Sequence, residues 1–226
     1  MVSFKKLKSF ALVSVFEKNN LNLLCGLFKR NKIGIISSGS TSKKIKSLGY
    51  DCFEISKLTK FNEVLDGRVK TLHPNIYISL LHNRDNHDHK KTFKNTNFPK
   101  IDFVIVNLYP FSKYQKNKRY NAVEMIDIGG PTLLRAAAKN FESVTSISSP
   151  RDYTLLINNI QKNSGKTDLS FRKKMAAKTF KLISKYDQNI HNWFINNKDR
   201  KDIKLKYGEN PHQKAKLKKK KHFQFS

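Results

Sequence analysis

The chain has 226 residues, enough to bury one sizeable core, and it carries a formal net charge of +28 from 45 Lys and Arg against 17 Asp and Glu. Its two cysteines are too few for a disulfide framework, and no apolar run approaches the roughly 18 residues of a membrane span. These features predict a single domain in a reducing, cytoplasmic compartment, without a secretory signal or a membrane partner.

The high charge does not by itself indicate a nucleic-acid-binding protein. Most of the basic residues are lysines that are scattered along the whole chain, and no aromatic residues interleave with them to form a stacking platform. We therefore expect weak, salt-sensitive polyanion binding and no specific nucleic-acid partner.

The first part of the chain alternates short apolar runs with amphipathic segments. Strands are predicted at residues 10–15 and 33–36, and helices at 21–30 and 41–48, the second of which ends at Gly49. Such alternation predicts an α/β fold.

The loop between the second strand and the second helix is the best candidate for a phosphate site. It reads Ser37-Ser38-Gly39-Ser40-Thr41 and opens a helix. Hydroxyls and free backbone N–H groups at a helix N-terminus bind phosphate well. Short serine-rich loops are also common turns, so an ordinary connection is the alternative.

A second cationic segment follows at residues 66–74. In an extended chain Arg68 and Lys70 lie on the same side, and two cations on one face attract an anion. His73 precedes Pro74, so a simple hydrogen bond from its ring to the backbone is the alternative to a role in binding.

Residues 84–100 are polar and predict a surface insertion. His87 and His89 lie within it, but few other residues of the type that bind metals surround them. We therefore expect no metal site in this segment.

The apolar, β-branched run at residues 103–106 predicts a buried strand that Pro110 ends. Asn107 and Tyr109 then fall at the carboxyl end of this strand, where ligands bind in open α/β sheets. For Tyr109 the alternative is a tyrosine at a strand end with a solvated hydroxyl.

Residues 127–140 contain the most informative pattern. Gly129-Gly130 permits a backbone path that a β-carbon would block, and Pro131 suits a first helical turn. A carboxylate at Asp127 and an ammonium at Lys139 flank this anion-binding turn, so they could transfer protons. The alternative is a helix packed on a sheet, with Asp127 as a cap and Lys139 as a surface charge.

The other predicted elements complete an alternating order. They are a helix at 121–125, a strand at 143–147, a helix at 152–160 and a long helix at 170–194. The apolar stripe of the long helix is predicted to comprise Phe171, Met175, Phe180, Ile183, Ile190 and Phe194.

Four segments together resemble the IMP cyclohydrolase domain of the bifunctional purine-biosynthesis enzymes: residues 67–74, 107–111, 126–140 and 207–213. The resemblance implies a methylglyoxal-synthase-like, three-layer α/β fold with a mainly parallel central sheet flanked by helices. It also implies a homodimer that closes a formylated aminoimidazole carboxamide ribotide to IMP with loss of water. No cofactor and no metal are expected.

The resemblance assigns roles to individual residues. Lys70, Tyr109, Asp127 and Lys139 match the positions around the reacting atoms, with Asp127 accepting or orienting the carboxamide proton. Backbone N–H groups at Ile128 and Gly129, aided by Lys139, would hold the oxyanion, while Tyr109 and Lys70 relay a proton. The expected substrate contacts are Ser14, Lys18, Ser38, Gly39, Ser40, Thr41, Arg68, Thr71, Asn107, Ile128 and Gly129.

Three loops depart from the family pattern. Phe16 replaces a hydroxyl residue, Ser40 replaces a glycine and would be strained at a positive φ, and residues 77–79 replace a histidine and small residues. These changes leave open a second possibility, a catalytically weak remnant that binds nucleotide or a partner chain.

The resemblance also divides the chain into residues 1–203, the cyclohydrolase domain, and 204–226, which begins like the transformylase domain. A lysine-rich, disordered tail is predicted at the end. Transformylase activity is accordingly not expected from this chain, and a separately encoded transformylase is a possible partner.

Overall fold

The computed structural model describes residues 7, 9–65, 69–114 and 122–196, with the backbone of two short strands at 203–204 and 216–217. The predicted substrate residue Arg68 lies outside the described residues. So do residues 207–213 of the family resemblance and most of the tail that is predicted to be disordered.

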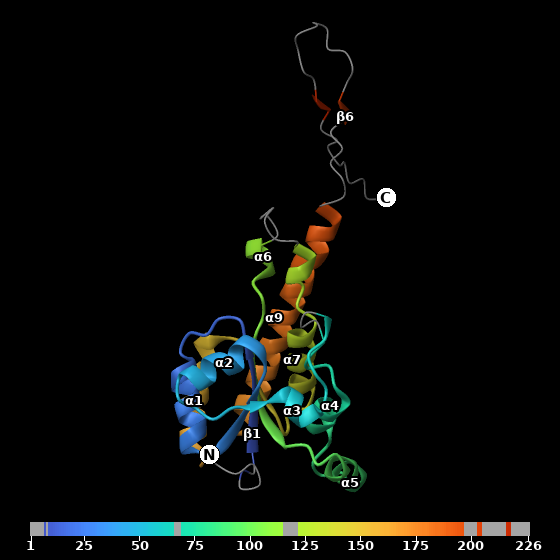
Figure 1. The fold of residues 1–226 in the computed structure, drawn as a ribbon. Coiled ribbons are helices and arrows are strands. Elements are labelled where there is room, and N and C mark those ends of the chain that lie inside the picture. Colours follow the sequence, from blue (N-terminus) through green and yellow to red (C-terminus); the bar gives the residue numbers. More distant parts are fainter. Residues whose placement is uncertain are drawn as a thin grey trace, which may run out of the picture.

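A five-stranded parallel sheet forms the centre of the molecule, with the strand order β3-β2-β1-β4-β5 (Figure 1). The strands are β1 (Ser9–Val15), β2 (Ile33–Ser37), β3 (Phe53–Glu54), β4 (Ile101–Asn107) and β5 (Thr145–Ile147). Because β1 is central and the chain proceeds first to β2 on one side and later to β4 on the other, the order reverses between β1 and β4. Ligands bind at such a switch point in open α/β sheets.

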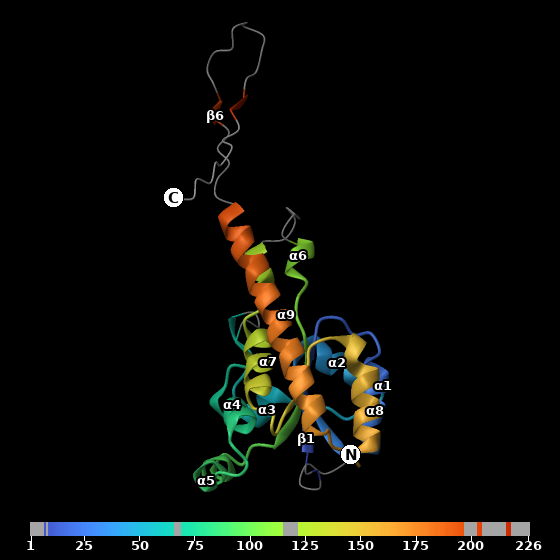
Figure 2. The same ribbon diagram turned by 180° about the vertical axis from the view of Figure 1, so that it is seen from behind.

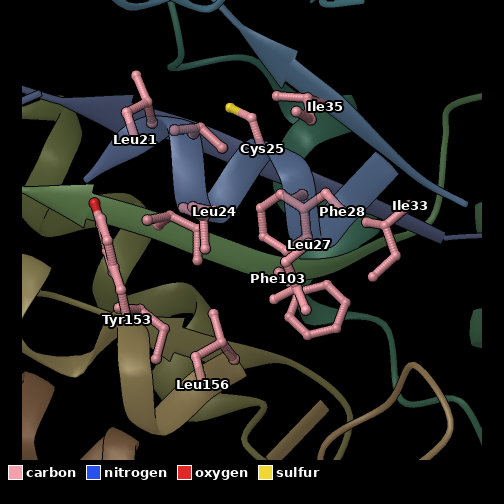
Figure 3. Close-up of a cluster of buried hydrophobic side chains, with 14 of the residues drawn as sticks. Leu21, Leu24, Cys25, Leu27, Phe28, Ile33, Ile35, Phe103, Tyr153 and Leu156 are labelled. Carbon is pink, nitrogen blue, oxygen red and sulfur yellow. The ribbon is translucent and has the colours of Figure 1, made fainter. Parts of the chain in front are cut away.

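Alternate residues of the strands are buried on opposite faces of the sheet. Ala11 and Val13 pack with α1 (Leu21–Arg30) and α8 (Tyr153–Lys162), in the cluster of apolar side chains that Figure 3 shows. Leu12 belongs to the other cluster, which includes α4 (Pro74–Leu81) and α7 (Gly129–Lys139). Burial on both faces explains why the strands are almost continuously apolar.

The longest helix, α9 (Leu169–Asn196), packs against α7 and β5 and continues beyond the sheet toward α6 (Figures 1 and 2). Its 28 residues correspond to roughly 40 Å at 1.5 Å per residue. The remaining elements are α2 (Gly39–Ser47), α3 (Ile55–Thr59), α5 (His87–Asn95), α6 (Phe111–Tyr114), the 3₁₀ helices η3 (Ala122–Met125) and η4 (Pro150–Asp152), and an antiparallel pair, β6 (Ile203–Lys204) and β7 (Lys216–Leu217).

The predicted parallel α/β fold is confirmed, and the helix at 21–30 has the predicted bounds. Most of the polar segment 84–100 does lie at the surface, where it forms α5, none of whose residues is buried. Its end does not, because Phe98 is 6% exposed and belongs to the same core cluster as Leu12.

The apolar stripe predicted for α9 is partly wrong. Phe180 and Phe194 are 41% and 54% exposed, whereas the buried α9 residues include two polar ones, Thr179 and Tyr186. These two continue the 3.6-residue phase of Met175 and Ile183, so position in the helical turn outweighs side-chain hydrophobicity here.

Candidate active site

A cleft of about 470 Å³ opens at the carboxyl edge of the sheet, and we call it the carboxyl-edge cleft. Its volume falls in the range of small-molecule sites, roughly 300–1,000 Å³. It is lined by Ser14, Lys70, Thr71, Tyr109, Val123, Glu124, Ile126, Asp127, Ile128, Gly129 and Gly130. The structure thus brings together predicted site residues from four separate segments of the chain.

Asp127 is fixed by the turn that precedes α7. Its Oδ1 accepts a hydrogen bond from the Gly130 N–H at 2.8 Å. Burial raises the pKa of the Asp127 carboxyl above its usual range, while the Gly130 N–H and the positive charge of Lys70 act in the opposite direction. The result is a carboxylate that is held in one orientation and is more basic than a solvated one.

The two glycines of this turn are required by lack of space. Neither has a positive φ. A β-carbon at Gly130 would lie 2.9 Å from the Asp127 carboxyl carbon, and one at Gly129 would lie 2.8 Å from Thr71 Oγ1. The prediction that a β-carbon would block this path is therefore confirmed, with packing rather than backbone conformation as the reason.

The turn is also held by α9. The Asp127 N–H donates to Tyr186 Oη at 2.8 Å, and the Tyr186 hydroxyl donates to the Met125 carbonyl at 3.2 Å. Sequence reasoning missed Tyr186. The available signal was its phase, three residues after Ile183 on the buried side of α9.

Tyr109 lies in the cleft, where two negatively charged side chains act on its hydroxyl. Its ring is tilted against Phe16, with 5.0 Å between the ring centroids. Burial first, and then the negative charges of Asp127 and Glu63, raises the pKa of the Tyr109 hydroxyl. Tyr109 is thus a protonated donor at neutral pH, in the same cleft as the carboxylate that is the candidate base.

Asn107 braces the fold next to the cleft. Its Oδ1 accepts from the N–H groups of Phe16 at 2.7 Å and Glu17 at 2.8 Å, and its Nδ2 donates to the Glu17 carbonyl at 3.0 Å. These bonds tie the loop after β1 to the end of β4. Asn107 is not among the residues that line the cleft, so its predicted contact with the nucleotide would have to compete with this bracing role.

The predicted phosphate loop lies beside the cleft, at the start of α2. Gly39 has a φ of 53°, whereas Ser40 has no positive φ, so the condition under which the serine would be strained is not met. The Thr41 hydroxyl donates to the Val15 carbonyl at 3.1 Å and accepts from the Val15 N–H at 3.2 Å. Thr41 therefore anchors the helix start to β1, next to Ser14 in the cleft.

Two predicted lysines are not among the residues that line the cleft. The Lys18 ammonium donates to the Phe16 carbonyl at 3.3 Å in its own loop. Lys139 is exposed and is the last residue of α7, about 15 Å along the helix axis from Gly129 at 1.5 Å per residue. Nearly the whole helix therefore separates Lys139 from the turn that holds Asp127 within one chain, and the role predicted for Lys139 at the oxyanion stays a prediction.

The altered segment around α4 serves the fold. His73 Nδ1 accepts from the Asn75 N–H at 3.3 Å as a helix cap, which agrees with the simpler interpretation of this histidine. The Ser79 hydroxyl donates to the Pro99 carbonyl at 2.8 Å and accepts from the Ile101 N–H at 3.0 Å. Burial raises the pKa of Tyr77 to about 12. By contrast, the altered loop with Phe16 has a ring contact with a cleft residue, Tyr109.

The residues that the structure describes were also searched for metal-binding groups and for membrane-spanning helices. Within them, no group of three or more His, Cys, Asp and Glu side chains could hold a metal ion, and His87 and Asp88 form only an exposed pair at 3.6 Å. No helix in this part of the chain is both long and apolar enough to cross a membrane.

The fold and the position of the cleft define an MGS-like domain, and the family of that description matches residues 21–132. A solved structure described as the crystal structure of ForH superposes with a TM-score of 0.75. The match has 26% sequence identity and covers 85% of this chain and 100% of that chain. The predicted methylglyoxal-synthase-like fold is confirmed.

The AICARFT/IMPCHase bienzyme family matches residues 137–225. The bifunctional purine biosynthesis protein PurH of Clostridium perfringens is 43% identical over 221 residues, which cover 92% of this chain and 44% of that protein. The PurH of Fusobacterium nucleatum is 43% identical over 217 residues, covering 91% of this chain and 42% of that protein. The chain therefore matches the IMP cyclohydrolase portion of these proteins, and it spans less than half the length of these curated relatives.

Proposed function

We propose that the chain is an IMP cyclohydrolase, which closes the formylated aminoimidazole carboxamide ribotide to IMP with loss of water. The observation that carries the proposal is the carboxyl-edge cleft, in which Asp127, Tyr109 and Lys70 surround the start of α7. The family relationship supports the same reaction.

The first requirement of the reaction is a proton acceptor. The carboxamide nitrogen is a poor nucleophile because its lone pair is delocalised, so it must lose a proton as it bonds to the formyl carbon. Asp127 suits this role because burial raises the pKa of its carboxyl, and because Gly130 fixes its orientation.

The second requirement is stabilisation of the formyl oxygen, which becomes negatively charged. Pro131 has no N–H and the Gly130 N–H is taken by Asp127, so the N–H groups of Ile128 and Gly129 are the backbone donors at this helix start. Tyr109 and Lys70 would supply a proton to this oxygen. When the C–O bond breaks, Asp127 can return the proton that it accepted, and water leaves. The nitrogen that carried the formyl group loses its own proton as the C=N bond forms, and that proton would restore Tyr109 or Lys70.

The rest of the nucleotide would extend along the edge of the sheet. We propose that its phosphate binds at the start of α2, with Ser38 and Gly39, where the first N–H groups of the helix have no intrahelical partner. Thr71 and Ser14, which line the cleft, would contact the part of the nucleotide between the phosphate and the reacting ring.

The test is to follow conversion of the formylated ribotide to IMP by ultraviolet absorbance with the purified chain. Turnover in the range of ordinary enzymes, about 1–10³ s⁻¹, is the expected result. Conversion no faster than in buffer would contradict the proposal.

Nucleotide binding without turnover is the second candidate function, and the contact of Phe16 with Tyr109 favours it, since it alters the surroundings of a proposed proton donor. In that case IMP would bind in a calorimeter while the absorbance stays constant. Sizing by light scattering, alone and with a transformylase chain, would test the proposed homodimer and the alternative partner.

A further inference from the structure

Tyr186 contacts two of the three segments that carry the proposed reactive side chains, those of Asp127 and Tyr109. It is 9% exposed and lies on α9, 59 residues along the chain from Asp127. Its hydroxyl bonds the Asp127 N–H and the Met125 carbonyl, which are on either side of Ile126. Its ring packs edge-on against Phe111, at 6.4 Å between centroids.

Phe111 connects this contact to Tyr109. The Phe111 N–H donates to the Tyr109 carbonyl at 2.8 Å, so the two residues form one tight turn after β4. One side chain from α9 therefore packs on the turn that carries Tyr109 and hydrogen-bonds the turn that carries Asp127. A change in this side chain would accordingly be felt by both turns.

We propose that Tyr186 is a positioning residue for ring closure, which sets the Asp127 carboxylate relative to Tyr109. The inference rests on the proposed function. The Asp127 carboxylate is bonded to the backbone of its own turn at Gly130, so its location follows that backbone. The backbone in turn is fixed by the hydroxyl of Tyr186 at two points.

The state of the hydroxyl suits this role. Burial raises the pKa of Tyr186 to about 12, so the hydroxyl stays protonated and can donate to Met125 while it accepts from Asp127. Without the hydroxyl, a backbone N–H and a backbone carbonyl would both lose their partner, and the turn would move to find new ones. A displacement of about 1 Å at a reacting group costs roughly 100-fold in rate.

Tyr186→Phe is the informative variant, because it keeps the ring against Phe111 and removes only the hydroxyl. The matched control is Thr179→Val, which removes another buried hydroxyl of the same helix, one that donates to Ser146 Oγ at 3.0 Å. Both variants are assayed for ring closure at a temperature where circular dichroism shows them fully folded.

For Tyr186→Phe we expect kcat to fall about 10- to 100-fold with KM within about twofold, since the substrate is still bound but the base is displaced. For Thr179→Val we expect kcat to remain within about twofold despite a similar loss of thermal stability. Equal kcat values for Tyr186→Phe and the wild type would overturn the role of Tyr186. An inactive wild type would instead contradict the proposed function.

Hydrogen exchange of the wild-type protein gives a readout that needs no activity. The Asp127 amide is expected to be as protected as the amides in the centre of α9, whereas the neighbouring Ile128 amide exchanges fast. Fast exchange of both amides would show that the bond to Tyr186 does not persist, and the inference would fail whether or not the chain is an enzyme.

Discussion

The starts of α2 and α7 both place glycine at the carboxyl edge of the sheet, but for opposite reasons. At α2, Gly39 has a φ of 53° and a β-carbon there would meet nothing within 4 Å. At α7, Gly129 and Gly130 have no positive φ, yet a β-carbon on either would collide with Thr71 or Asp127. We call the start of α2 at Gly39 the open cradle, because its shape comes from backbone conformation and the space around it is free. We call the start of α7 at Gly129 and Gly130 the packed wall, because close contacts fill the space around it.

This difference implies different functions for the two helix starts. An open helix start can accept an anion whose exact position is not critical, as in phosphate binding. A packed start fixes its neighbouring carboxylate and N–H groups, as the reacting end of a substrate requires. Substitutions should therefore affect binding at α2 and turnover at α7.

Asp127→Asn removes the negative charge next to the packed wall but keeps the shape of the side chain. We expect this variant to have the largest effect on turnover. The asparagine side chain keeps an oxygen acceptor for the Gly130 N–H but cannot take a proton, so turnover should fall by about 10²- to 10⁴-fold. The measurement is kcat by the absorbance assay. Activity close to that of the wild type would exclude Asp127 as the base.

The same variant makes a prediction about stability. Because burial raises the pKa of Asp127 in the folded state, its contribution to stability is complete below the unfolded pKa of about 3.9 and is lost as the pH rises through the folded value. The uncharged amide would not undergo this loss, so Asp127→Asn should melt no lower than the wild type at pH 7, and any advantage should shrink as the pH falls to about 4. A melting temperature several degrees lower at pH 7 would contradict the assigned direction of the pKa.

Gly130→Ala tests the packed wall directly. The added β-carbon would push on the Asp127 carboxyl group and on Leu108, so we expect turnover to fall by about 10²-fold while the protein remains folded. Gly26→Ala is a suitable control, because a β-carbon at Gly26 would meet only side-chain atoms of Tyr50 and Arg30, at 3.3 and 3.4 Å. Full activity of Gly130→Ala would mean that Asp127 needs no fixed position.

Gly39→Ala tests the open cradle and should have a smaller effect. Alanine at a φ of 53° costs on the order of 1 kcal/mol of stability and shifts the first N–H groups of α2. We expect KM to rise about threefold to tenfold, with kcat within about twofold. Gly49→Ala is matched to it, since Gly49 has a φ of 81° and open space at the other end of the same helix. An equal rise in KM for both variants would contradict the proposal that the phosphate binds at the start of α2.

How far the sequence predicts these features depends on whether the cause is local. The parallel sheet and the places of Tyr109 and Asp127 follow from a strand end and from a glycine turn, which are local patterns, whereas the place of Lys70 is expected only from the family resemblance. The role of Asn107 does not, because its partners lie about 90 residues away in the loop after β1. Tyr186 is similar, since nothing in the sequence near it indicates that its hydroxyl meets the turn before α7.

Lys139→Ala is expected to have the smallest effect and gives the sharpest limit on the site. Lys139 ends α7 at the opposite end from the packed wall, about 15 Å away at 1.5 Å per residue, which is beyond the reach of its side chain. Within one chain, turnover should stay within about threefold, and the loss of a cation at a helix C-terminus should cost about 0.3–1 kcal/mol. Lys162→Ala, at the same position of α8, is the control for that helix-end effect. If Lys139→Ala alone lowered turnover 100-fold, the ammonium would have to enter the cleft from a second copy of the chain, and mixing Lys139→Ala with Asp127→Asn protein would then restore activity.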